Sequence, residues 1–173
     1  MISEKMQKAL SEQINWELYS SYLYLSMSSH FHSVNLGGFA SWMRVQAQEE
    51  LLHAIKFYDF VHERGGKVLL QPVKAPPSDW NSPLAAFEAV VKHEEHVSKR
   101  INDLASLAIK EKDHATSIFL QWFVTEQVEE EASANEVVQK LRLIGDAGGG
   151  IFMLDRELSQ RVFTMPAAAE GKA

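Results

Sequence analysis

Acidic residues and a histidine interrupt four apolar stripes that otherwise have the periodicity of helices facing a core. The interrupting residues are Glu17, Glu50, His53, Glu94 and Glu130. Glu50 and His53 are three residues apart, so on a helix both side chains point at one position. Carboxylate oxygens with a single imidazole and no sulfur suit iron or manganese, with zinc as a competitor. The pattern predicts a carboxylate-rich metal site.

The interruptions recur at a fixed spacing. Glu17 and Glu50 are 50 − 17 = 33 residues apart, and Glu94 and Gln127 are again 127 − 94 = 33 apart. The two halves are offset by 94 − 17 = 77 residues. Such a repeat predicts two helical hairpins related by a pseudo-two-fold axis. The hairpins would bring six polar residues to one level of the core: Glu17, Glu50, His53, Glu94, Gln127 and Glu130.

The electrostatics of these positions favour metal binding over a purely structural role. Taken singly, a glutamate in such a stripe is usually a surface residue, and a lone His53 is more often a hydrogen-bonded core residue. Four carboxylates together have no lysine or arginine in the four stripes to compensate them, and each uncompensated buried ion would cost several kcal/mol. Two divalent cations would neutralise the four negative charges.

Composition excludes several other kinds of function. The chain has 17 Lys and Arg against 23 Asp and Glu, so its formal net charge is −6. That balance argues against nucleic acid or an anionic membrane as the partner. Without cysteine there can be no disulfide, thiolate ligand or cysteine nucleophile. No apolar run approaches the roughly 20 residues of a membrane span, and the N-terminus does not resemble a signal peptide. We therefore expect a cytoplasmic protein.

Four long helices are expected to position these residues, over 4–31, 36–64, 83–111 and 114–144. Ser3, Ser82 and Asp113 are the predicted N-caps, and Pro83 suits the first helical position. Gly145 and the run Gly148-Gly149-Gly150 should break the fourth helix. A short fifth helix, 151–163, then presents Ile151, Leu154, Leu158 and Val162 on one side. We expect one domain over 1–165 and a disordered tail over 166–173.

Connection lengths predict the topology. Short links make helices one and two, and helices three and four, antiparallel neighbours. The segment 66–82 has 17 residues, which span roughly 56 Å when extended, whereas a 28-residue helix is roughly 42 Å long. This segment can therefore cross the bundle and make helices two and three parallel. The predicted fold is all-α, a four-helix bundle with one long crossover and a short fifth helix.

At these residues the chain resembles the non-haem bacterial ferritins, over about 6–158. The segments that carry the resemblance are ELYSSYLY at 17–24, AQEELLH at 47–53, KHE at 92–94 and FLQWFVTEQVEEE at 119–131. The resemblance implies the ferritin-like di-iron fold and iron storage with ferroxidase activity, in which Fe²⁺ is oxidised by O₂. It also implies a homo-oligomeric hollow shell of 24 subunits with 432 symmetry, whose four-fold axes the fifth helix lines.

The resemblance assigns a role to each residue of the predicted dinuclear centre. Glu17, Glu50 and His53 would hold the first iron, with Glu50 bridging, and Glu94 and Glu130 would hold the second. Gln127 lies close by. Tyr24 matches a family tyrosine that hydrogen-bonds the centre and donates an electron during oxidation; the alternative is a core aromatic residue with a satisfied hydroxyl group.

A third iron position is implied beside the pair, at Glu49, Glu126 and Glu129, with Glu130 shared. Adding 77 to 49 gives 126, so acids recur there in both halves. The alternative is that the run Glu129-Glu130-Glu131 is a solvated helix face.

Departures from related families narrow the implied function. Bacterioferritins would have a second Glu-x-x-His where this chain has Gln127 and Glu130, and a haem-ligating methionine where it has Leu51; haem is therefore not expected. Animal ferritins line a three-fold pore with acids where this chain has Ser117 and Leu120, which puts iron uptake by that route in doubt.

Two other functions remain open from the sequence. One is a di-iron or di-manganese oxidoreductase of the same bundle class that stores nothing. The other is a metal-free helical interaction module whose acids face solvent, although it leaves the 33-residue repeat unexplained.

Overall fold

The computed structural model describes residues 1–145 and 148–164, and within these ranges the chain is entirely helical apart from its connections. Its helices are α1 (Glu4–Ser33), α2 (Gly37–Glu63), α3 (Pro83–Lys110), α4 (His114–Ile144) and α5 (Gly148–Leu158). The bounds of the four long helices agree with the prediction to within two residues. The all-α prediction is confirmed.

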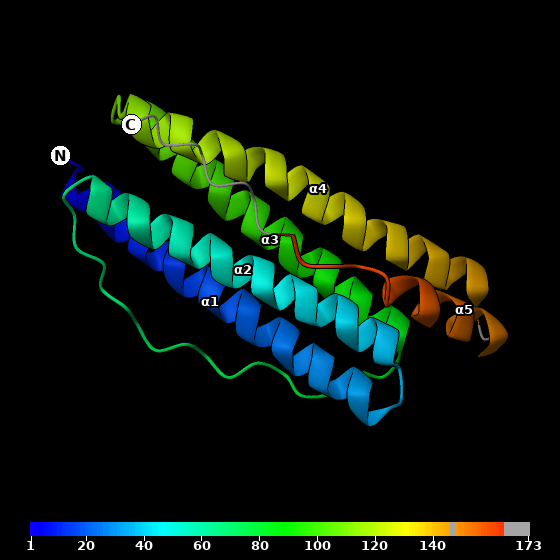
Figure 1. Ribbon diagram of the computed structural model, residues 1–173. Helices are drawn as coiled ribbons and strands as arrows, with labels where there is room; N and C mark the ends of the chain where they lie inside the picture. Colours follow the sequence, from blue (N-terminus) through cyan, green and yellow to red (C-terminus); the bar gives the residue numbers. More distant parts are fainter. Residues whose placement is uncertain (146–147, 165–173) are drawn as a thin grey trace.

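The four long helices form two antiparallel hairpins, α1 with α2 and α3 with α4, lying side by side (Figure 1). The connection between α2 and α3 runs along the outside of α1 for the length of the bundle, so α2 and α3 are parallel, as predicted. Asn15 donates to the carbonyl of Gln71 at 3.0 Å, and Ser26 donates to the carbonyl of Pro77 at 2.6 Å. These hydrogen bonds hold the extended connection against α1.

The predicted helix caps are present. Ser3, Ser82 and Asp113 each accept a hydrogen bond from the backbone N–H three residues ahead, which satisfies an amide that has no partner within the helix. After α2 the chain turns at Gly65, whose φ of 73° is in the left-handed region that glycine adopts most readily.

The core consists of two apolar clusters. One, at the α5 end, contains Phe31, Phe39 and Phe87. The other, at the opposite end, contains Phe57 and Phe123, whose rings stack with centroids 4.1 Å apart. Between the clusters the bundle buries a layer of polar side chains, so the two clusters fix the helices on both sides of that layer.

The prediction for the fifth helix was wrong at both ends. Gly148-Gly149-Gly150 forms its first turn instead of a break, and the helix ends at Leu158, which leaves Val162 outside it and exposed. Leu154 and Leu158 are buried against the core. This packing outweighs the low helix propensity of glycine, which costs only about 1 kcal/mol per residue.

The start of α2 is capped from a distance by α5. The Asp155 carboxylate accepts hydrogen bonds from the backbone N–H groups of Gly38 and Phe39, at 2.7 and 3.0 Å. A negative group at this helix end is favoured by the helix dipole. A Cβ on Gly38 would lie 1.6 Å from the carbonyl oxygen of Asp155, so only glycine allows this approach.

The tail predicted to be disordered, 166–173, lies outside the described residues. Within the described ranges, no helix is long and apolar enough to cross a membrane.

Gly38→Ala should displace α5 from α2 and destabilise the chain by about 1–3 kcal/mol, the usual cost of overpacking. Thermal unfolding followed by circular dichroism measures the effect. Gly37→Ala is the matched control, because a Cβ added to Gly37 would meet nothing within 4 Å; it should be neutral or stabilising. Equal midpoints for the two variants would contradict the close approach of α5.

Candidate metal centre

The polar layer gathers the six side chains expected at one level of the core, with contributions from all four long helices. They are Glu17 from α1, Glu50 and His53 from α2, Glu94 from α3, and Gln127 and Glu130 from α4. Each is at most 5% exposed. The alternative in which these acids face solvent is therefore wrong.

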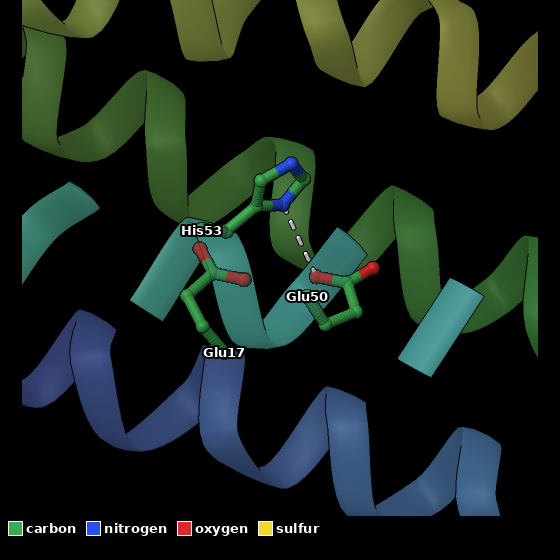
Figure 2. A group of neighbouring side chains, drawn as sticks. All are labelled: Glu17, Glu50 and His53. Carbon is green, nitrogen blue, oxygen red and sulfur yellow. Dashed lines mark ion pairs between the residues drawn. The ribbon is translucent and has the colours of Figure 1, made fainter. Parts of the chain in front are cut away.

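The first candidate metal-binding group is Glu17, Glu50 and His53, whose potential ligand atoms all lie within 4.8 Å of one another. Figure 2 shows Glu17 reaching from α1 toward the two residues on α2. Nδ1 of His53 lies 3.3 Å from Oε2 of Glu50. The three side chains face one point, as the Glu-x-x-His spacing predicts.

The second candidate group is His53, Glu126 and Glu130, again with potential ligand atoms within 4.8 Å of one another. Nε2 of His53 lies 4.0 Å from Oε1 of Glu126. The imidazole of His53 therefore lies between the two groups, with Nδ1 toward Glu50 and Nε2 toward Glu126. If a metal bound one nitrogen, the other would face a carboxylate, the arrangement that usually fixes the tautomer of a ligating histidine.

Glu94 faces the centre from α3 and is oriented by two neutral donors. The hydroxyl of Tyr24 donates to its Oε1, and the amide of Gln127 donates to its Oε2 at 3.2 Å. Tyr24 is fully buried. Its hydroxyl is therefore both satisfied and directed at a candidate ligand, which is compatible with either role considered for it.

Two glutamines that the sequence analysis did not assign to the site also donate to its carboxylates. Gln13 donates to Oε1 of Glu17 at 2.8 Å, and Gln46 donates to Glu130 and, at 3.4 Å, to Glu50. Both amides are buried. Gln46 is four residues before Glu50 on α2, so the two side chains share a helix face, and this spacing was the available sequence signal.

Two carboxylate oxygens of the centre accept no hydrogen bond, although Nδ1 of His53 lies 3.3 Å from one of them, Oε2 of Glu50. Within residues 1–145 and 148–164, the buried side-chain polar atoms without a partner are Glu17 Oε2, Glu50 Oε2 and His30 Nδ1. Such groups are rare because an unmet buried acceptor costs roughly 1–3 kcal/mol. Two of the three lie in the first candidate group, where a cation would use those lone pairs. The donor set thus fits hard divalent metal ions.

Burial and crowding favour the protonated acids in the absence of metal. Burial, assisted by the charge of Glu50, raises the pKa of Glu17 from 4.5 to about 8. Burial and the charge of Glu130 raise the pKa of Glu94 to about 8. The pKa of Glu50 is also raised well above its usual value, by burial and by the charges of Glu94 and Glu130. Protons and metal ions therefore compete for the same oxygens.

The acids expected at a third metal position occupy different environments. Glu126 is partly buried within the second candidate group, whereas Glu129 is exposed. Glu49 is partly buried, and burial raises its pKa to about 7 despite a salt bridge with Arg161, whose Nη2 lies 2.6 Å from its Oε2. Arg161 comes from the segment after α5, and no periodic pattern in the sequence pointed to it.

Comparisons of sequence support the resemblance noted above. The family described as Ferritin-like domain matches residues 7–144. The bacterial non-heme ferritin of Bacteroides fragilis (strain 638R) is 49% identical over 161 residues, covering 93% of this chain and 100% of the relative. The bacterial non-heme ferritin of Campylobacter jejuni is 41% identical over 156 residues, covering 90% and 93%.

Solved structures agree with the sequence relatives. A structure described as a closed form of the Archaeoglobus fulgidus ferritin, engineered by site-directed mutagenesis, has a TM-score of 0.94 and 62% identity, covering 95% of this chain and all of that chain. A structure described as a novel open pore ferritin from the same archaeon has a TM-score of 0.93 and 61% identity, covering 94% of this chain and all of that one.

The stability of the metal-free protein should fall as pH rises from about 4.5 to about 8. The unfolded chain releases the protons of Glu17 and Glu94 near 4.5, whereas the folded chain keeps them to about 8, so rising pH favours unfolding within this window. Added Zn²⁺ should reverse the trend, because its ligands must be deprotonated. Thermal midpoints at several pH values, with and without Zn²⁺, measure this. A metal-free midpoint that does not change with pH would contradict it.

Glu17→Gln should stabilise the metal-free protein at pH 8 by about 1–2 kcal/mol, because it replaces a buried acid by a neutral group of the same shape. It should also remove much of the stabilisation by Zn²⁺, since a ligand has been lost. Glu12→Gln is the control, because Glu12 is exposed on the same helix; both quantities should stay as in the parent chain. Undiminished stabilisation of Glu17→Gln by Zn²⁺ would exclude Glu17 as a ligand.

Proposed function

The chain belongs to the ferritin family of iron-storage proteins, and we propose that its polar layer is a ferroxidase centre, which oxidises Fe²⁺ with O₂ before the Fe³⁺ is stored as mineral. The observation that carries this proposal is the first candidate group. There, Glu17 and Glu50 each present a buried oxygen without a hydrogen-bond partner beside His53. Iron is here the substrate of the centre.

In this proposal the side chains bind two Fe²⁺ ions side by side. Glu17 and His53 hold the first ion, and Glu94 and Glu130 hold the second. The charges of Glu94 and Glu130 both act on Glu50, and this central position supports a bridging role for it. Two Fe²⁺ ions supply two electrons to O₂, and holding both in one site replaces encounters in solution. Hard carboxylate ligands favour the Fe³⁺ that forms.

Tyr24 is proposed to orient Glu94 and to donate an electron during oxidation. Its hydroxyl donates a hydrogen bond to Glu94, which gives the proton of an oxidised tyrosine a nearby acceptor. Burial, together with the charge of Glu94, raises its pKa well above 10, so the hydroxyl keeps its proton at rest.

We propose a third iron position on the side of the centre where Glu126, Glu130 and Glu49 lie. The grouping of His53, Glu126 and Glu130 supports it, as does the partly buried carboxylate of Glu49. Glu129 would join from the exposed side of α4.

Storage also requires a hollow shell, proposed to be a cytoplasmic homo-oligomer of 24 subunits with 432 symmetry. In the single chain, Phe152 and Met153 on α5 are 71% and 74% exposed. Burying these apolar side chains between subunits would give α5 a role in assembly. The similar ferritin of Archaeoglobus fulgidus is described as having an open pore, and a closed form of it was engineered by site-directed mutagenesis.

Aerobic loading with Fe²⁺ should give a particle of shell size that retains far more iron than its metal centres alone can hold. Size-exclusion chromatography with iron analysis of the eluted protein measures this. A small oligomer that keeps only the ions of the centre would instead favour the non-storing di-iron oxidoreductase.

In stopped-flow measurements, Glu130→Ala should slow oxidation by at least about tenfold, since loss of even an outer partner of a metal site typically costs that much.

Glu95→Ala is the control, because Glu95 is exposed on α3. This variant should oxidise Fe²⁺ at the same rate as the parent chain. An unchanged rate in Glu130→Ala would refute its assignment to the second iron.

A further inference from the structure

The segment after α5 turns back along the bundle (Figure 1), and its Arg161 lies against α2. The backbone N–H of Arg161 donates to the carbonyl of Leu158 at 3.3 Å, in a turn that follows the helix directly. Because Leu158 is buried and Asp155 caps α2, this turn starts from a fixed position. The docking of α5 therefore determines where Arg161 lies.

Arg161 makes three contacts with α2. Its Nη1 donates to Oε1 of Gln46 at 2.7 Å, its Nη2 donates to Oε2 of Glu49 at 2.6 Å, and its guanidinium carbon lies 4.4 Å from the ring centroid of Trp42. The planar fork of a guanidinium suits two acceptors and a ring face at once. The side chain is 23% exposed, so solvent screens this ion pair less than it would a surface pair.

Glu49 is at the same time a candidate ligand. Its carboxylate interacts with the charges of Glu126 and Glu130, two members of the second candidate group. Within the described residues, the basic side chain that forms a salt bridge with Glu49 is Arg161. A metal ion that used Oε2 of Glu49 would compete with the guanidinium for that oxygen.

We infer that Arg161 is a built-in cation that holds Oε2 of Glu49 while the third metal position is empty and gives up this oxygen when a metal ion binds there through it. This inference rests on the proposed function, since it presupposes that position. Arg161 is thus a positioning residue of the centre, and the affinity of the third position is set by competition between a guanidinium and a metal ion.

Gln46 connects this competition to the dinuclear pair. Its amide oxygen accepts from Arg161 while its amide nitrogen donates to Glu130 and Glu50. The guanidinium thereby fixes which end of the amide faces the carboxylates. When Arg161 leaves, Gln46 loses the partner that orients its amide. The hydrogen bonds that Gln46 donates to Glu50 and Glu130 therefore depend on whether the third position is occupied.

The test is a calorimetric titration of the full-length metal-free protein with Zn²⁺, which has no redox chemistry. Arg161→Gln should strengthen the weakest zinc site by about fivefold, the equilibrium factor for the upper end of what a partly exposed ion pair contributes. Its two tighter sites should change by less than this, because Arg161 reaches their ligands only through Gln46. Arg161→Lys should lie in between, because it keeps the charge but loses the fork. Arg156→Gln is the control for net charge, since Arg156 is exposed on α5; it should match the parent chain.

Hydrogen exchange of the peptide covering 159–164 gives a readout independent of affinity. In the parent chain, exchange should accelerate only as the third equivalent of Zn²⁺ binds. In Arg161→Gln it should already be fast without metal.

Three outcomes overturn the inference. Displacement of Arg161 would be excluded if the affinity of the weakest zinc site were the same in Arg161→Gln as in the parent chain. It would also be excluded if hydrogen exchange of 159–164 did not change as the third equivalent of Zn²⁺ binds. Neither result would contradict the dinuclear centre. If the parent chain binds no zinc at all, the proposed metal centre fails together with the inference.

Discussion

Four carboxylates share one buried layer of this bundle, and the rest of the structure depends on how their charge is compensated. Within the described ranges, no lysine or arginine donates a hydrogen bond to Glu17, Glu50, Glu94 or Glu130; their side-chain donors are glutamine amides and a tyrosine hydroxyl. Neutral donors orient carboxylates but cannot cancel their charge. The negative charge of the layer is therefore compensated either by protons or by metal ions. The apolar clusters on both sides keep the four helices at the spacing that this layer requires.

The pseudo-two-fold repeat relates Glu17 to Glu94 but does not relate the groups that orient these two acids. Adding 77 carries Glu17 to Glu94, but it carries Gln13 to Val90 and Tyr24 to Ile101. Glu17 is thus oriented by an amide, and Glu94 by a hydroxyl and a different amide. The two proposed metal positions would consequently have different surroundings, which gives a chemical basis for unequal affinity or reactivity within the pair.

The sequence was sufficient to predict the long helices, their topology and the acids and histidine of the polar layer, although not Gln13 and Gln46, because each of these predictions depends on periodicity, caps or spacing along one chain segment. It did not predict that α5 would begin in Gly148-Gly149-Gly150, since packing of Leu154 and Leu158 overrides local propensity. Nor did it reveal Arg161 beside Glu49, 161 − 49 = 112 residues away. That contact follows from where α5 docks, which no pattern along the chain encodes.

The crossover between α2 and α3 also separates the ligands into two sets. It lies on the surface and is fixed by few hydrogen bonds, such as those from Asn15 and Ser26, while the close backbone packing is mainly within each hairpin. Cutting the chain in this connection would leave each fragment with only part of the ligands and an uncovered half of each apolar cluster. The two fragments should then reassemble more readily with a divalent cation than without one, so the hairpins could serve as a split sensor for metal ions.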